Sequence, residues 1–145
     1  MKTIMVINGV NLNMLGIREK NIYGNATYEG LCEYVRSSSK EMQVNLVFFQ
    51  SNHEGAIVDC MQKCYFENFD GIVLNPGAHT HYSYALYDAI KSIAPIPVVE
   101  VHISDIHSRE EFRRVSVTAP ACIAQISGKG FDGYVEAVKM LVERK

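Results

Sequence analysis

The sequence predicts a single α/β domain built on a parallel β-sheet, and two observations lead to this prediction. Five short, nearly continuous apolar runs occur along the chain, as is typical of parallel strands that are buried on both faces. Segments with helical spacing of apolar residues alternate with these runs. Alternating strands and helices form right-handed βαβ units, so we expect a flavodoxin-like three-layer sandwich with a five-stranded parallel sheet and strand order 2-1-3-4-5.

The apolar runs set the expected strands at residues 3–8, 44–49, 71–74, 97–101 and 121–126. Helical spacing marks residues 31–42, 57–65, 86–93 and 134–142. Thr27 is the expected N-cap of the first helix. Ser51 and Ser108 are each followed three residues later by a glutamate, so both predict a capping box that opens a helix.

One long loop, from Gly9 to Gly24, separates the first strand from the first helix. Loops of this length are uncommon in compact domains and often serve as lids. The loop leaves the carboxyl end of a strand, which is where open α/β sheets bind their ligands. We therefore expect residues 1–145 to form one catalytic domain with a lid loop at about residues 9–24.

Composition limits the classes of function. The chain has 145 residues, 48% of them hydrophobic, and a formal net charge of −2, so no basic excess favours nucleic acid or an anionic membrane. No run approaches the ~20 apolar residues of a membrane span. The first apolar run is too short for a signal peptide. The four cysteines form no C-x-x-C pair, and a reducing cytoplasm is the expected location.

Polar and titratable residues that could bind a ligand or catalyse a reaction lie in or beside three of the predicted strand ends. Asparagine, tyrosine and arginine occur in the long loop, histidines follow the third strand, and a glutamate and a histidine lie two residues apart on one face of the fourth. This set suits a polyhydroxylated carboxylate ligand and acid/base chemistry. Its members are Asn11, Arg18, Tyr23, Asn75, His79, His81, Glu100, His102, Arg109 and Arg113.

Each candidate has a structural alternative. Tyr23 could be a packing residue, but a neighbouring cation such as Arg18 favours the phenolate and lowers its pKa. His102 could be a hydrogen-bonded structural histidine rather than an acid tuned by Glu100. Arg18 could equally form a solvated surface pair with Glu19.

Two further patterns suggest other functions. His79 and His81 form an H-x-H pair that, with His102, could bind a metal in a hydrolase or lyase. The glycine-rich segment 128–133 matches G-x-G-x-x-G, but only twelve residues follow it, so it lacks the rest of a dinucleotide-binding unit. We expect it to be a turn into the last helix. A non-catalytic flavodoxin-like module that binds a flavin or a partner protein is the other alternative.

Several linked motifs resemble the type II 3-dehydroquinases. They run in order from the first strand to the last helix, and together they are far more specific than any one alone. The motifs are INGVNLN at 7–13, Gly16, Arg18–Glu19, residues 22–24, QSNHEG at 50–55, NPGAHTH at 75–81, EVHIS at 100–104 and residues 107–113.

The resemblance implies dehydration of 3-dehydroquinate to 3-dehydroshikimate by trans elimination through an enolate, without metal or cofactor. Tyr23 is then the base, and Arg18 holds it as phenolate. Asn11 steadies the enolate oxygen through a water. His102 is the acid that protonates the leaving hydroxyl, oriented by Glu100.

The same resemblance implies how the substrate is bound. Asn75 and the backbone N–H groups of Ile103 and Ser104 bind its carboxylate. His81 and Arg113 bind ring hydroxyls. The small molecule 3-dehydroquinate is the expected ligand, either in the shikimate pathway of aromatic amino acid biosynthesis or in the quinate pathway.

The resemblance also implies a homododecamer, a tetramer of trimers, in which Asp88 reaches into a neighbouring subunit's site and Arg109 helps to order the lid. Two positions depart from the family pattern. Val10 replaces a usual proline, and His79 replaces a common tyrosine. Neither change removes a residue with an implied role, so we expect activity to survive.

Overall fold

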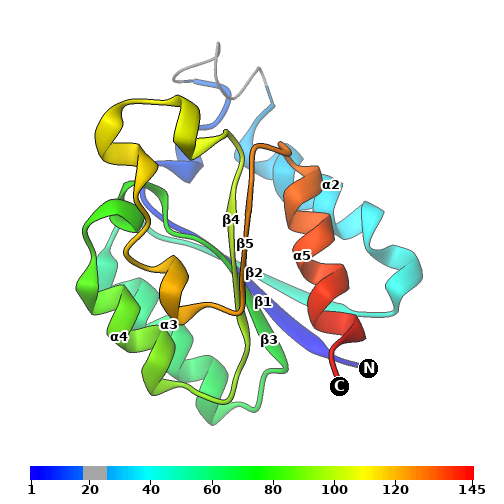
Figure 1. Cartoon of the computed structure of the whole chain (residues 1–145). Coiled ribbons are helices and arrows are strands. Elements are labelled where there is room, and N and C mark those ends of the chain that lie inside the picture. Colours follow the sequence, from blue (N-terminus) through cyan, green and yellow to red (C-terminus); the bar gives the residue numbers. More distant parts are fainter. Residues whose placement is uncertain (18–25) are drawn as a thin grey trace.

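The computed structural model describes residues 1–17 and 26–145. Its five strands form one parallel sheet in the order β2-β1-β3-β4-β5, which confirms the predicted flavodoxin-like topology (Figure 1). The strands are β1 (Thr3–Asn8), β2 (Asn45–Gln50), β3 (Gly71–Asn75), β4 (Val98–His102) and β5 (Ala124–Ser127).

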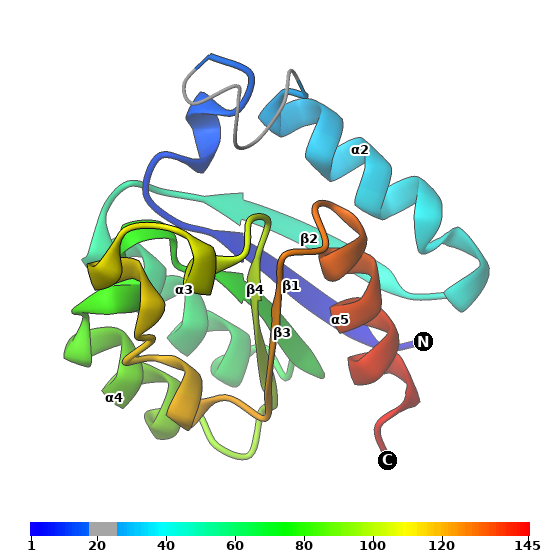
Figure 2. The ribbon, with the colours of Figure 1, turned by 45° about the horizontal axis from the view of Figure 1, so that its top comes forward.

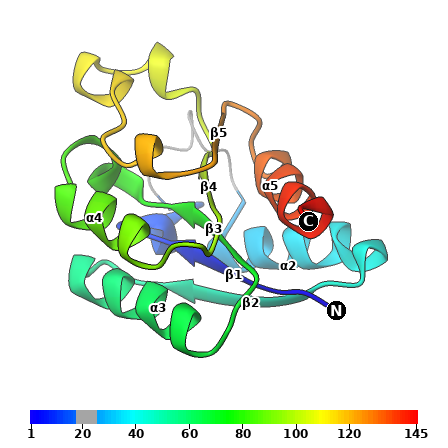
Figure 3. The ribbon, with the colours of Figure 1, turned by 60° about the horizontal axis from the view of Figure 1, so that its bottom comes forward.

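Helices cover both faces of the sheet. One face carries α2 (Tyr28–Ser38) and α5 (Asp132–Glu143), and the other carries α3 (Glu54–Phe66) and α4 (Tyr84–Ser92) (Figures 2 and 3). Short 3-10 turns complete the described chain: η1 (Leu12–Met14), η2 (Lys40–Met42), η3 (Gly77–His81), η4 (Ile106–Ser108), η5 (Glu111–Arg114) and η6 (Ala119–Ala121). No helix in the described part is long and apolar enough to cross a bilayer.

Alternation along the central strands divides the core into two layers. Ile4 and Val6 of β1 pack toward α2 and α5, whereas Met5 and Ile7 pack toward α3 and α4. Side chains on a strand point to opposite faces in turn, and a strand buried on both faces is therefore apolar at almost every position. All five residues of β3 are buried for this reason.

The structure corrects three local predictions. Neither predicted capping box forms: His53 precedes α3 as N-cap without a side-chain cap, and Glu110 occupies that position ahead of η5. Instead of capping, Glu54 accepts a hydrogen bond from Ser83. The fifth strand begins at Ala124 rather than at residue 121, because the preceding residues form the turn η6. The glycine-rich segment 128–133 is a turn into α5, as expected.

Candidate active site

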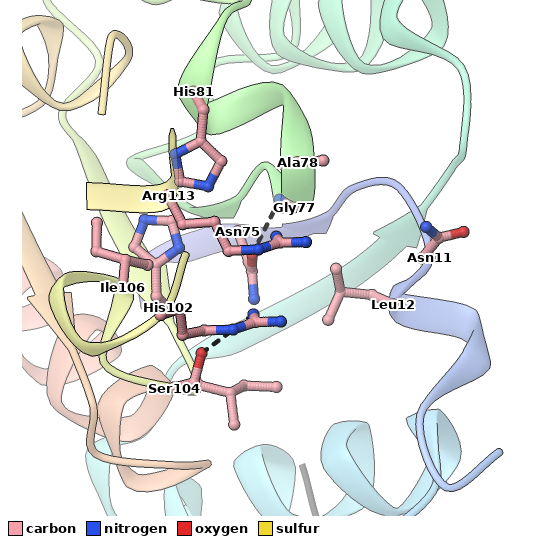
Figure 4. A pocket seen from close by; sticks show the side chains of 12 residues that line it. Asn11, Leu12, Asn75, Gly77, Ala78, His81, His102, Ser104, Ile106 and Arg113 are labelled. Atoms are coloured by element: carbon pink, nitrogen blue, oxygen red, sulfur yellow. Dashed lines mark hydrogen bonds between the residues drawn. The ribbon is translucent and has the colours of Figure 1, made fainter. Parts of the chain in front are cut away.

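A pocket lies at the carboxyl ends of β1, β3 and β4, where the sequence predicted ligand binding (Figure 4). In an open α/β sheet this edge collects the loops that follow the strands. The pocket is lined by Asn11, Leu12, Asn75, Gly77, Ala78, His81, His102, Ile103, Ser104, Ile106, Arg109 and Arg113.

Two glycines allow the loops after β1 and β3 to interlock beneath the pocket. The Gly9 amide donates to the Asn75 carbonyl at 2.7 Å, and a Cβ at Gly9 would lie 2.4 Å from the carbonyl oxygen of Pro76. Gly77 has a φ of +65°, and a Cβ there would lie 2.6 Å from the Val10 carbonyl oxygen. Only glycine fits such close backbone approaches. The turn signal at residues 75–77 thus fixes the start of the long loop against Asn75.

The Glu100–His102 pair forms as the sequence predicted. His102 Nε2 lies 2.8 Å from Glu100 Oε2, and both side chains are buried. Three further groups donate to the same carboxylate: the Ser116 hydroxyl, the Thr118 hydroxyl and the Gln125 amide. Gln125 reaches Glu100 because the two residues are register partners on β5 and β4. A buried carboxylate with this many donors is fully satisfied.

These donors keep Glu100 ionised. Burial alone raises the pKa of the Glu100 carboxyl group. The hydrogen bond and the charge of His102 lower this pKa, as do the hydrogen bonds from Thr118 and Gln125. Together they outweigh burial, so the pKa of Glu100 is lowered overall. A carboxylate can only accept, so His102 donates through Nε2–H. The Nδ1 atom of His102 is therefore the ring nitrogen left for other partners.

His81 is held in the opposite tautomer. Its Nδ1 lies 2.8 Å from the Val115 carbonyl oxygen, which can only accept, so Nδ1 carries a hydrogen. Burial lowers the pKa of His81, and the nearby His102 and Arg113 lower it further. His81 is therefore neutral at neutral pH, and its Nε2 is an acceptor suited to a hydroxyl group.

Two arginines supply positive charge to the pocket. Arg113 donates through Nε to Glu110 at 2.8 Å, and its guanidinium lies over the ring of Phe112. Arg109 donates to the Ser104 hydroxyl at 3.5 Å. The pocket thus combines two guanidinium groups with an amide and a neutral imidazole, which suits an anion that also bears hydroxyls.

The structure brings most of the predicted site residues together. Asn75, His81, His102, Ile103, Ser104, Arg113 and Asn11 line the pocket, and Glu100 lies directly behind His102. Asn11 adopts a left-handed backbone, with φ 71°, and its backbone N–H donates to Asn52 Oδ1. Asp88 is exposed on α4 and does not line this pocket. Tyr23 and Arg18 lie outside the described residues.

Sequence reasoning missed the residues that surround Glu100. Ser116 and Thr118 follow η5, and Gln125 lies on the edge strand. A polar residue at the register position opposite a buried glutamate was the one available signal, and it could be used only once the pairing of β4 and β5 was known.

The proposed histidine metal site is not formed by the described chain. Within residues 1–17 and 26–145, no three His, Cys, Asp or Glu side chains gather closely enough to hold a metal ion. His79 is buried against the ring of Tyr82 rather than grouped with His81 and His102.

Fold and site together define a flavodoxin-like α/β protein with a buried glutamate–histidine pair beside a pocket that two arginines line. A family model described as dehydroquinase class II matches residues 2–142, so the chain belongs to the class II dehydroquinase family. The 3-dehydroquinate dehydratases of Clostridium beijerinckii and Clostridium acetobutylicum are similar to it, at 58% identity over 142 residues and 59% over 138. These matches cover 98% and 95% of this chain, and 97% and 94% of the two relatives.

Solved structures agree with the family. The type II dehydroquinase from Butyrivibrio crossotus is 55% identical, with a TM-score of 0.94 and coverage of 97% of both chains. The type II dehydroquinase from Propionibacterium acnes is only 34% identical but has the same TM-score of 0.94, over 99% of this chain and 98% of that one. The arrangement of the sheet is therefore retained where two thirds of the residues differ.

Proposed function

We propose that this chain dehydrates 3-dehydroquinate to 3-dehydroshikimate, in the shikimate pathway, by trans elimination through an enolate. The observation that carries the proposal is the buried Glu100–His102 pair, which lies beside two arginines in a pocket of a class II dehydroquinase. The relatives named above are 3-dehydroquinate dehydratases.

His102 is the proposed general acid. Its Nε2–H is committed to Glu100, so a proton carried by Nδ1 can pass to the leaving hydroxyl. The ionised Glu100 stabilises the imidazolium that carries this proton, and it fixes the orientation of the ring.

The other polar groups of the pocket match the carboxylate and the ring hydroxyls of the substrate. Asn75 and the backbone N–H groups of Ile103 and Ser104 bind the carboxylate, while His81 and Arg113 bind ring hydroxyls. The neutral His81 supports this role, because its free Nε2 accepts a hydrogen bond from a hydroxyl. The proposed ligand is a monoanion with several hydroxyls, in keeping with the pocket's charge.

Proton removal is assigned to the lid. Tyr23 acts as phenolate, Arg18 holds its charge, and Asn11 steadies the enolate oxygen through a water. The position of Asn11 in the pocket lining supports this, because the lid segment continues from it along the chain. Stabilising the enolate matters most, since a proton beside a ketone is acidic only when the developing charge is bound.

We also propose that the chain assembles as a homododecamer, a tetramer of trimers, and acts in the cytoplasm. The exposed Asp88 supports the assembly, because it lies outside its own pocket and is free to reach another subunit's site. The four unpaired cysteines fit a reducing compartment.

The direct test of the reaction uses purified protein, 3-dehydroquinate and excess chelator, and follows the ultraviolet absorbance of the conjugated enone product. We expect a rate proportional to enzyme concentration. A rate that disappears with chelator and returns with added metal would favour the alternative metal-dependent lyase. No product from folded protein would contradict the proposed function.

A further inference from the structure

A chain of buried polar groups joins the pocket residue Asn75 to helix α5. Tyr134 of α5 is fully buried in an otherwise apolar cluster, and its hydroxyl donates to Asn8 Oδ1 at 2.6 Å. The Asn75 amide nitrogen Nδ2 donates to the same hydroxyl at 2.8 Å. Asn8 and Asn75 are register partners on β1 and β3, so one hydroxyl from the helix above can bridge them.

The Gly77 N–H and this chain together fix which end of the Asn75 amide faces each neighbour. The backbone N–H of Gly77 lies 3.1 Å from Asn75 Oδ1 and can only donate, so the oxygen of Asn75 must face it. The nitrogen of Asn75 therefore faces Tyr134. The single hydrogen of the Tyr134 hydroxyl is used on Asn8, which leaves the hydroxyl oxygen to accept from Asn75.

The consequence reaches the pocket. One N–H of Asn75 is used on Tyr134 and its oxygen on Gly77, which leaves the second N–H as the group that Asn75 can offer to a ligand. Asn75 lines the pocket at its centre (Figure 4). Asn75 is thus set as a donor, which suits a carboxylate oxygen, and not as an acceptor, which would suit an amide or ammonium group.

We propose that Tyr134 is a positioning residue that, together with the Gly77 N–H, holds Asn75 in the donor orientation and so tunes the pocket for a substrate carboxylate. This inference rests on the proposed function, in which Asn75 binds that carboxylate. Tyr134 does not touch the substrate. It acts through Asn75, and its anchor for doing so is Asn8.

The test is Tyr134→Phe, which keeps the ring in the core and removes the hydroxyl. We expect KM for 3-dehydroquinate to rise about tenfold, the size of one lost hydrogen bond, with kcat changed much less. A merely structural role would lower stability or the active fraction and leave KM unchanged. Tyr34→Phe is the matched control, because exposed Tyr34 contacts the same helix through Asp132 and should keep both constants.

Binding of quinate and of its carboxamide, measured by calorimetry, gives a second readout that needs no turnover. We expect the preference of the wild type for the carboxylate to fall about tenfold in Tyr134→Phe. If that variant does not fold, Asn8→Ala, which removes the anchor of the hydroxyl, should shift both readouts in the same direction. An unchanged KM and an unchanged preference would overturn the role of Tyr134. A wild type that binds quinate without dehydrating 3-dehydroquinate would contradict the proposed function instead.

Discussion

At the scale of single residues, the site depends on tautomers fixed by obligate partners. Glu100 can only accept, so it requires a hydrogen on His102 Nε2, and the Val115 carbonyl requires one on His81 Nδ1. The two histidines therefore present opposite ring nitrogens to the pocket. One is available as an acid and the other as an acceptor, although both are the same residue type.

The lowered pKa of Glu100 predicts a dependence of stability on pH. Its ionisation stabilises the fold above the unfolded-state value of about 4.3, and this contribution is lost as the pH falls through the lower folded-state pKa. Urea unfolding at pH 7 and pH 3 measures it. We expect the wild type to lose more free energy of unfolding on acidification than Glu100→Gln, which has no carboxylate to protonate.

Glu136→Gln is the matched control, because Glu136 is on the surface and pairs with Lys129. It should lose as much stability on acidification as the wild type. Equal losses in the wild type and in Glu100→Gln would show that Glu100 is not held ionised by its neighbours.

The sequence allowed part of this site to be predicted. The Glu100–His102 pair followed from the two-residue period of a strand, which is a local rule. The donors Ser116, Thr118 and Gln125 could not be predicted, because they meet Glu100 through strand register and turns that follow from tertiary packing. Tyr134 fitted an apolar helix face, and nothing local showed that its hydroxyl had partners.

At the scale of elements, the predicted N-cap of α2 was confirmed, whereas the predicted capping box of α3 was wrong. Thr27 caps α2, and its hydroxyl accepts from the Gly30 amide at 3.0 Å. The Ser51 hydroxyl instead accepts from His53, one residue before α3 begins. Glu54, which a capping box would direct back to Ser51, bonds across to Ser83 on the neighbouring helix start. A tertiary contact has replaced the local one.

This difference predicts unequal costs for two alanine substitutions. Thr27→Ala should reduce the free energy of unfolding by about 1 kcal/mol, because the first turn of α2 loses its cap. Ser51→Ala should cost less, within about 0.5 kcal/mol, because its bond is made outside the helix. Thermal and urea unfolding of both variants measure this. A larger cost for Ser51→Ala would contradict the assignment of the cap.

At the scale of the whole molecule, the sheet order was predictable because handedness and adjacency leave few ways to arrange five parallel strands joined by crossovers. The strand boundaries were less predictable than the order. The fifth strand, β5, begins three residues after its predicted start at residue 121, because the chain first makes a turn against α4. Assembly depends on surfaces that periodicity does not describe. It entered only through the family resemblance.

The assembly proposal predicts a sedimentation mass twelve times the 16.3 kDa of one chain. Asp88→Asn should then raise KM by about tenfold without changing this mass, because Asp88 acts in another subunit's pocket. Asp59→Asn, an exposed aspartate on α3, is the control. A fully active monomer would contradict both the dodecameric assembly and the role of Asp88 in another subunit's pocket.

The central claim, that His102 is the acid of a dehydratase, is tested most directly by comparing His102→Gln with His53→Gln. His53 is exposed at the start of α3, away from the residues that line the pocket. Turnover of 3-dehydroquinate, followed as enone absorbance, should fall in kcat by about 10²- to 10⁴-fold for His102→Gln and stay unchanged for His53→Gln. A kcat for folded His102→Gln close to that of the wild type would contradict the account.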